Sequence, residues 1–165
     1  MLLLGAFLFS PALGVPTARA AEAVQNASEV GVEYSILDEQ GSVIESNRGE
    51  NPLWYTHGQG QIIRGLEKAL EGTQVGEQKT VKLRPEDAYG PINRSAFREV
   101  PRGSIPPEFL KLGARLLGHT AHGQSHPGRI HEIKEKTVVV DLNHPLAGRT
   151  LTFEVKILAI RPAKK

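Results

Sequence analysis

The chain has 165 residues, of which 39% are hydrophobic and 23% charged. This balance is typical of a soluble globular protein with one domain, or with one domain and a small insertion. The formal net charge is only +2, and no cluster of Lys and Arg is interleaved with aromatic residues, which argues against nucleic acid as a partner. Cysteine is absent, which excludes disulfides, thiol catalysis and cysteine-ligated metals.

The first twenty residues have the pattern of a secretory signal peptide. A mostly apolar run from Leu2 to Leu13 is followed by the breakers Gly14 and Pro16 and by a small-x-small sequence at residues 18–20. The run is too short to cross a bilayer, which takes about 20 apolar residues. No Lys or Arg precedes it, and an uncleaved apolar tail is the alternative. We expect residues 1–20 to be removed on export, to the periplasm of a bacterium, which leaves a mature protein without a membrane partner.

Residues 21–29 are small and polar, and we expect them to form a flexible leader. From Val30 onward apolar and polar residues alternate, which predicts a strand with one buried side. A turn is expected at residues 40–41, and a second strand begins at Val43. Leu53–Thr56 is a candidate for a third, short strand.

The clearest helix is predicted for Ile62 to Leu70, because its apolar residues fall on one stripe. Gly72 is expected to end it. Gly65 in the helix interior costs about 1 kcal/mol relative to Ala, which indicates close packing of another segment against the backbone there. Alternation predicts further strands at residues 79–83 and 150–160.

Residues 91–143 differ in composition from the rest of the chain, since they hold five of the eleven prolines and four of the six histidines. A stretch of this length with its own apolar residues is too long for a structureless loop, so we predict a small inserted β-rich domain. The Gly-, His- and Pro-rich residues 121–128 are expected to form a hairpin tip. The strands expected in this domain are residues 97–100, 115–119, 129–134 and 137–142.

The most informative stretch runs from Leu53 to Gly90. It contains Ile-Ile-Arg-Gly-Leu-Glu, Leu-x-Gly, Val-Gly and Ala-Tyr-Gly in that order, and Asn-His-Pro-Leu-Ala-Gly-Arg-Thr-Leu-Thr-Phe-Glu-Val follows after a long interval. This arrangement closely resembles the FKBP-type peptidyl-prolyl isomerases. The long interval resembles their SlyD-like branch, whose flap carries an inserted chaperone domain.

The resemblance implies an α+β fold in which an antiparallel twisted sheet wraps around one short helix. The isomerase domain would comprise residues 30–90 and 144–161, and residues 91–143 would be the domain inserted in the flap. The implied substrates are proline-containing proteins that are unfolded or partly folded. We do not expect the histidine-rich metal tail of the SlyD-like branch, because the printed sequence stops at Pro-Ala-Lys-Lys.

The resemblance also implies the site residues, position by position. The catalytic group falls on Tyr89, Ile63, Tyr34 and Glu45, with the Tyr89 hydroxyl and the Ile63 amide holding the substrate carbonyl. The family usually has Asp where this chain has Glu45, and many relatives have Trp where it has Leu66. The remaining substrate-binding wall falls on Leu53, Tyr55, Ile62, Leu66 and Phe153.

Such a pocket suits the chemistry without a cofactor. Rotation about an X–Pro bond faces a barrier of about 18–20 kcal/mol that arises from amide resonance. The twisted transition state has lost that resonance and is less polar than the planar amide. An apolar, water-poor cavity with one or two hydrogen-bond donors therefore binds the twisted state preferentially.

Other functions stay open at this level. A holdase would bind unfolded chains with little turnover, and the departures at Glu45 and Leu66 leave this alternative open. The inserted domain would be only a lid if its apolar residues pack against one another in a small core of their own. A metal carrier is a third alternative because imidazoles bind Zn, Cu or Ni, but the spacing fits no standard site, and exposed hairpin residues are the simpler interpretation. The histidines concerned are His119, His122, His126 and His131.

Overall fold

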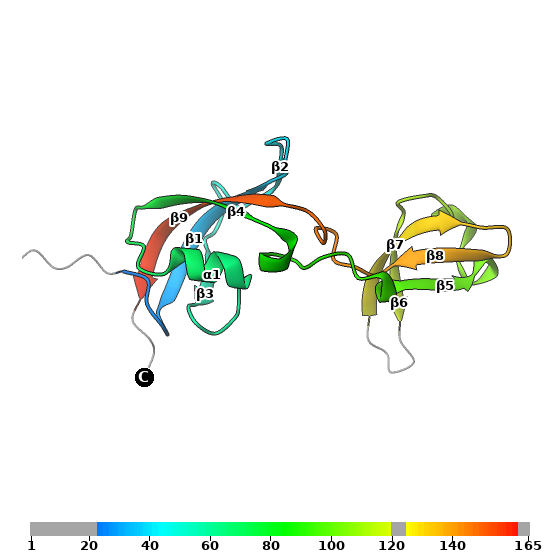
Figure 1. The fold of residues 1–165 in the computed structure, drawn as a ribbon, viewed down its shortest axis with the longest axis horizontal. Coiled ribbons are helices and arrows are strands. Elements are labelled where there is room, and N and C mark those ends of the chain that lie inside the picture. The colour runs from blue at the N-terminus through cyan, green and yellow to red at the C-terminus, as the bar shows by residue number, and fades with distance from the viewer. Residues whose placement is uncertain (1–22, 120–124, 162–165) are drawn as a thin grey trace, which may run out of the picture.

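The computed structural model describes residues 23–119 and 125–161. The predicted signal peptide, residues 1–20, and His122 lie outside these ranges. Two antiparallel sheets lie one after the other along the long axis of the molecule (Figure 1), and one α-helix packs against the first sheet. This is the α+β arrangement that we expected. None of the helices in the described ranges is long and apolar enough to cross a membrane.

The first sheet has five strands in the order β2-β1-β9-β4, with β3 paired to β1 beside this path. The long central strands β1 and β9 pair along the whole of β1. Alternate residues of β9 are buried, which matches the alternation predicted from the sequence. The strands are β1 (Glu29–Leu37), β2 (Val43–Ser46), β3 (Leu53–Thr56), β4 (Gln78–Leu83) and β9 (Leu151–Arg161).

Helix α1 (Arg64–Leu70) begins two residues later than predicted, because Ile63 is its N-cap with an extended ψ of 136°. Gly58 and Gly60 in the preceding loop both donate backbone hydrogen bonds to Glu67 Oε1, at 2.8 and 3.3 Å. These bonds tie the loop to the first turns of the helix. The C-cap is Glu71, and Gly72, expected to end the helix, follows it with φ at +74°. The Gly72 N–H donates to Val24 O at 2.8 Å and not to a helix carbonyl.

The close approach predicted at Gly65 is present. A Cβ at this position would lie 2.6 Å from the carbonyl oxygen of Asp87 and 3.0 Å from Leu83 Cδ2. Asp87 belongs to a short 3-10 turn, Pro85–Asp87, that leads directly to Tyr89. The missing side chain of Gly65 therefore lets this turn rest against α1.

The expectation of a flexible leader fails from Ala23 onward. Ala23 forms an isolated bridge with Gln74, and the Val24 backbone exchanges two hydrogen bonds of 2.8 Å with Gly72 and Thr73. Val24 is 1% exposed and belongs to the main hydrophobic cluster. A single buried valine has no periodicity, which is why the sequence pattern did not predict this contact.

The second sheet has four strands in the order β5-β8-β7-β6. Its cluster of buried residues is small, with Ile105, Ile130, Val138 and Val140. Two 3-10 turns, Arg102–Ser104 and Pro107–Phe109, follow β5. The strands are β5 (Phe97–Pro101), β6 (Arg115–His119), β7 (Ser125–Ile133) and β8 (Thr137–Asp141).

Strand β7 corrects the predicted hairpin tip, because it includes residues 125–128. Pro127 pairs with Leu117 of β6, whereas pairing of β7 with β8 begins only at Arg129. At Pro127 the strand thus has one neighbour, so one side of its backbone needs no ladder bond. A proline is tolerated in a strand under that condition.

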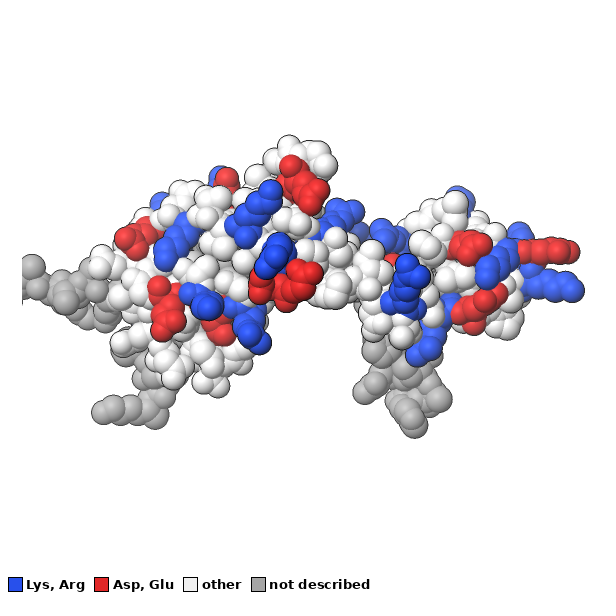
Figure 2. Space-filling view, in the orientation of Figure 1, with Lys and Arg blue, Asp and Glu red and all other residues white. Residues whose placement is uncertain are grey.

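Two segments that run next to each other join the sheets (Figure 1). Asn93 and Asn143 are reciprocally bonded, with Asn93 N donating to Asn143 Oδ1 at 2.8 Å and Asn143 Nδ2 donating to Asn93 O at 3.1 Å. Gly148 N also donates to Gly90 O at 2.8 Å. The chain therefore leaves the first sheet and returns to it at neighbouring points. On the face shown in Figure 2, charges of both signs are interspersed over both parts of the molecule.

Candidate active site

A cavity of about 440 Å³, here called the first-sheet cavity, lies between the first sheet and α1. All predicted site residues except Tyr55 line it. Tyr55 is 3% exposed in the hydrophobic cluster, and its hydroxyl lies 3.4 Å from Nδ1 of the buried His57. The cavity is lined by Val32, Tyr34, Ile36, Glu45, Leu53, Gly60, Gln61, Ile62, Ile63, Leu66, Leu70, Tyr89, Phe153 and Val155.

The residue before helix α1 supplies an unpaired backbone donor at this cavity. The Ile63 carbonyl accepts hydrogen bonds from the Leu66 and Glu67 amides, each at 3.0 Å. The Ile63 N–H itself has no hydrogen-bond partner among the described residues. It is one of the amides that every helix leaves unpaired at its N-terminus.

Tyr34 and Glu45 form a hydrogen-bonded pair on the opposite wall. The Tyr34 hydroxyl donates to Glu45 Oε1 at 2.6 Å, so the longer carboxylate of Glu reaches the tyrosine. This hydrogen bond, helped by burial and by the Glu45 charge, raises the pKa of Tyr34 to about 12. The hydroxyl thus stays protonated with its donor directed at Glu45.

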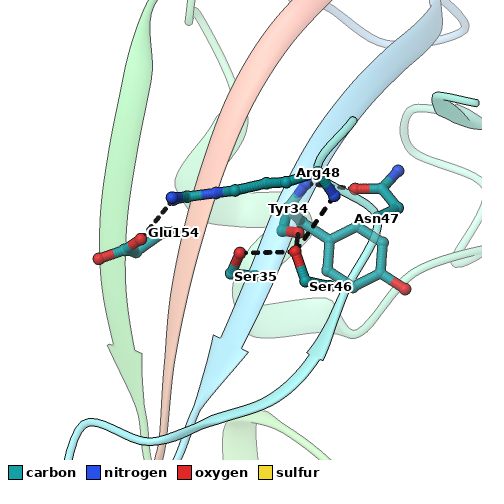
Figure 3. Close-up of polar contacts among 6 residues, drawn as sticks. All are labelled: Tyr34, Ser35, Ser46, Asn47, Arg48 and Glu154. Atoms are coloured by element: carbon teal, nitrogen blue, oxygen red, sulfur yellow. Dashed lines mark hydrogen bonds and ion pairs between the residues drawn. The ribbon is translucent and has the colours of Figure 1, made fainter. Parts of the chain in front are cut away.

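A polar network fixes the backbone of Tyr34, and the sequence analysis did not identify it (Figure 3). Tyr34 N donates to Asn47 Oδ1 at 2.6 Å, and Tyr34 O accepts from Ser46 Oγ at 3.0 Å. Arg48 extends across β9 to form an ion pair with Glu154. Ser46 ends β2, and Asn47 and Arg48 come from the turn between β2 and β3, which the sequence presents only as a polar loop.

Tyr89 carries another unpaired donor, since its hydroxyl has no hydrogen-bond partner in the described part of the chain. Burial raises the pKa of Tyr89, and the nearby charge of Glu45 adds to the effect. The ring of His144 stacks on the Tyr89 ring, with centroids 4.2 Å apart and planes 3° from parallel. His144 Nδ1 accepts a hydrogen bond of 3.2 Å from Leu146 N, and Leu146 is buried in the main cluster.

His144 is a site neighbour that the sequence analysis missed. It follows the second sheet in the chain, whereas Tyr89 precedes that sheet, so 55 positions of sequence numbering separate two rings in contact. The only signal was its place in the motif Asn-His-Pro-Leu-Ala-Gly. The stack thereby links the segment that enters the second sheet to the segment that leaves it.

Of the four histidines considered as metal ligands, the structure describes the side chain of His131 alone; the predictions for His119, His122 and His126 concern side chains outside its description. Among the side chains that are described, no group of three or more His, Cys, Asp or Glu is placed to hold a metal ion. His131 is exposed, and its ring meets the edge of Phe97 with centroids 4.9 Å apart.

Comparison with known proteins agrees with this geometry. A family model described as FKBP-type peptidyl-prolyl cis-trans isomerase matches residues 20–158. Three curated relatives carry the name FKBP-type peptidyl-prolyl cis-trans isomerase SlyD. The protein of Aeromonas hydrophila is 41% identical over 136 residues, covering 82% of this chain and 64% of that protein. This chain therefore spans a little less than two thirds of the Aeromonas protein.

The other two relatives are covered more fully. The protein of Treponema pallidum (strain Nichols) is 36% identical over 141 residues, covering 85% of this chain and 80% of that protein. The protein of Escherichia coli (strain K12) is 38% identical over 135 residues, covering 81% and 68%. The resemblance seen in the motifs is thus confirmed, and the chain belongs to the FKBP-type peptidyl-prolyl cis-trans isomerases.

Proposed function

We propose that this protein isomerises X–Pro bonds in unfolded or partly folded exported proteins. The observation that carries the proposal is an apolar cavity with two unpaired donors, the Tyr89 hydroxyl and the Ile63 N–H. No nucleophile is needed, because the barrier comes from amide resonance, which the twisted transition state has already lost.

The residues that line the cavity then have distinct roles in the reaction. The apolar side chains of Ile62, Leu66 and Phe153 surround the prolyl ring and exclude water, which favours the less polar twisted state. The two free donors hold the carbonyl that precedes the proline. Tyr34 does not compete for that carbonyl, because its donor is used by Glu45.

We also propose that the second sheet captures unfolded chains before they reach the cavity. A cleft of about 670 Å³, here called the second-sheet cleft, opens on this sheet, and its lining includes Phe109 and Leu117. These side chains are 43% and 63% exposed. A chain held there has a raised effective concentration at the first-sheet cavity, provided that the connecting segment can span the two sites.

A peptide assay tests the isomerase step. The chain without residues 1–20 should accelerate cis/trans isomerisation of a short proline peptide well above buffer. Rates equal to those in buffer would overturn the proposal and leave the holdase alternative, which suppression of aggregation of an unfolded protein would then reveal.

A second comparison tests capture. Phe109→Ser and Leu117→Ser should lose acceleration of a proline-limited protein refolding reaction while they keep short-peptide turnover. Val75→Ser is the matched control, because Val75 is 46% exposed and lies outside the second-sheet cleft. An equal loss in both assays, or a loss in the control, would contradict capture by this cleft.

Export rests on residues 1–20 alone and has its own test. Fusion of these residues to a reporter enzyme should deliver a shortened reporter to the bacterial periplasm. A full-length reporter that stays in the cytoplasm would show that the segment is not a signal peptide.

A further inference from the structure

We infer that Asn47 is a positioning residue for the isomerase reaction, because its side chain holds together three strands that form one wall of the first-sheet cavity. This inference rests on the proposed isomerase function and assigns a role to a residue that does not itself line the cavity. Asn47 is half-buried in the turn that follows β2.

The role arises from a change of partner along one edge of β1. On this edge β1 pairs with β3 through residues 29–32 and with β2 through residues 35–37. Glu33 and Tyr34 lie between these two ladders. Backbone N–H and C=O groups at such a position need other hydrogen-bond partners, and Tyr34 finds them in Asn47 and its neighbour Ser46.

The Asn47 carboxamide takes the place of a strand partner beside the Tyr34 backbone (Figure 3). Its Oδ1 accepts from Tyr34 N at 2.6 Å, and its Nδ2 donates to Val32 O at 3.1 Å and to Asn51 O at 3.2 Å. The Asn47 N–H also donates to Tyr34 O at 3.1 Å. A carboxamide is suited to this position because it offers an acceptor and two donors in one plane.

These bonds connect three residues of the cavity lining. Tyr34 in β1, Glu45 in β2 and Leu53 at the start of β3 all line the cavity. Glu45 precedes Asn47 by two residues, and Leu53 follows the acceptor Asn51 by two residues. The hydrogen bond of 2.6 Å from Tyr34 to Glu45 requires β1 and β2 to keep their spacing, and Asn47 joins the two strands next to it.

This role predicts a specific kinetic signature. The two donors that hold the substrate carbonyl, the Tyr89 hydroxyl and the Ile63 N–H, belong to other segments of the cavity and should stay in place when Asn47 is changed. A displaced wall therefore weakens contacts that the substrate makes in both the planar and the twisted state. Such a loss of uniform binding raises KM and leaves kcat nearly unchanged.

Steady-state kinetics on a short proline peptide, with the chain without residues 1–20, tests the inference. Asn47→Ala removes all three side-chain bonds. Asn47→Asp keeps the shape of the side chain but places an oxygen in place of the Nδ2 that donates to two carbonyl groups. Each change should raise KM about three- to fivefold, as expected for the loss of about one hydrogen bond, while kcat changes by less than about twofold.

A matched variant separates positioning from stability. Glu77 fixes another turn of the first sheet, since its Oε2 accepts from the Gln74 amide at 2.8 Å, and it does not line the cavity. Urea unfolding should show that Glu77→Ala and Asn47→Ala both destabilise the protein. Only Asn47→Ala should raise KM.

A double-mutant cycle shows whether Asn47 acts through Tyr34. Tyr34→Ala removes the side chain that Asn47 positions. Asn47→Ala should therefore raise KM less in the Tyr34→Ala background than in the unaltered chain, because residues that act as a unit give non-additive effects.

The outcomes separate this inference from the function beneath it. A KM that both Asn47 variants leave unaltered, an equal rise in Glu77→Ala, or additive effects in the cycle would overturn the inference while the isomerase function stands. Failure of both Asn47 variants to fold would overturn it too, since Asn47 would then serve the fold as a whole. An unaltered chain no faster than buffer would remove the proposed function, and the inference with it.

Discussion

The two sheets hold cavities of different character. The first-sheet cavity is built on thirteen buried apolar residues, and its tyrosine–glutamate pair is internally hydrogen-bonded. The second-sheet cleft is larger, rests on a cluster of four buried residues and is bordered by exposed Phe109 and Leu117. A bond rotation needs fixed donors in a preorganised pocket, whereas capture of varied segments needs an apolar surface that can adapt.

Core truncation in each sheet gives the largest expected effect. Leu151→Ala and Ile130→Ala remove side chains that are 0% and 1% exposed in the first and second clusters, and each should cost about 2–5 kcal/mol. Leu151→Ala should destabilise the catalytic part. Ile130→Ala should unfold the second sheet but leave short-peptide turnover intact, as monitored by urea unfolding and the peptide assay. Loss of turnover in Ile130→Ala would show that the two sheets are not independent.

Glycine substitutions compare the rigidity of the two sites. A Cβ at Gly65 would meet a backbone carbonyl, whereas a Cβ at Gly128 would meet the side chains of Val140 and Leu142 at 2.7 and 2.9 Å. We expect Gly65→Ala to destabilise by about 1–3 kcal/mol through overpacking. Gly128→Ala should cost less, because side chains can move where backbone cannot. Chemical unfolding measures both, and a larger cost at Gly128 would reverse the proposed contrast.

Removal of single hydroxyl groups tests the donor assignment in the first-sheet cavity. Tyr89→Phe should lower kcat/KM by about fivefold, which corresponds to one hydrogen bond of about 1 kcal/mol. Tyr34→Phe should have a smaller effect, since the Tyr34 donor is directed at Glu45 and not at the substrate. A larger loss of kcat/KM in Tyr34→Phe than in Tyr89→Phe would indicate that Tyr34, and not Tyr89, donates to the substrate.

Substitutions of His144 should have a smaller effect still. Asn at this position keeps an acceptor for the Leu146 amide but removes the ring stacked on Tyr89, whereas Phe keeps the ring and loses the acceptor. The stack acts only through Tyr89 and is expected to contribute about 0.5 kcal/mol, so His144→Asn should lower kcat/KM about twofold. His144→Phe should retain more turnover, and the opposite order would assign the contribution to the acceptor.

The smallest effect at neutral pH is expected from the ionisation of the tyrosines, which takes place only in alkaline solution. The pKa is raised above the ordinary value near 10 in all three tyrosines, by the Glu45 hydrogen bond in Tyr34 and by burial in Tyr55 and Tyr89. Their contribution to stability is thus complete below pH 10 and is lost as pH rises through the folded-state values. Ultraviolet absorbance of tyrosinate should show no native tyrosine ionising at or below pH 10.

The sequence predicted those features that depend on local periodicity or on an ordered motif. Alternation located β1 and β9, the apolar stripe located α1, and motif order located eight of the fourteen residues that line the cavity. Tyr55 shows the limit of this reasoning. It shares a face of β3 with Leu53, yet Leu53 lines the cavity while Tyr55 is buried in the main hydrophobic cluster.

Contacts between distant segments escaped prediction for a different reason. The stack of His144 on Tyr89 and the ion pair of Arg48 with Glu154 join residues that no local pattern relates. The burial of Val24 is similar, since it depends on a partner at Thr73. Only the folded chain brings these residues together.

The reciprocal hydrogen bonds between Asn93 and Asn143 have an evolutionary consequence. They hold together the two segments that lead into and out of the second sheet. The spacing between the end of β4 and the start of β9 therefore does not depend on the size of the second sheet. Lengthening a loop with fixed ends is cheap, at about 0.6 kcal/mol for each doubling. This base is therefore a position at which one inserted sheet can be exchanged for another while the first-sheet cavity stays unchanged.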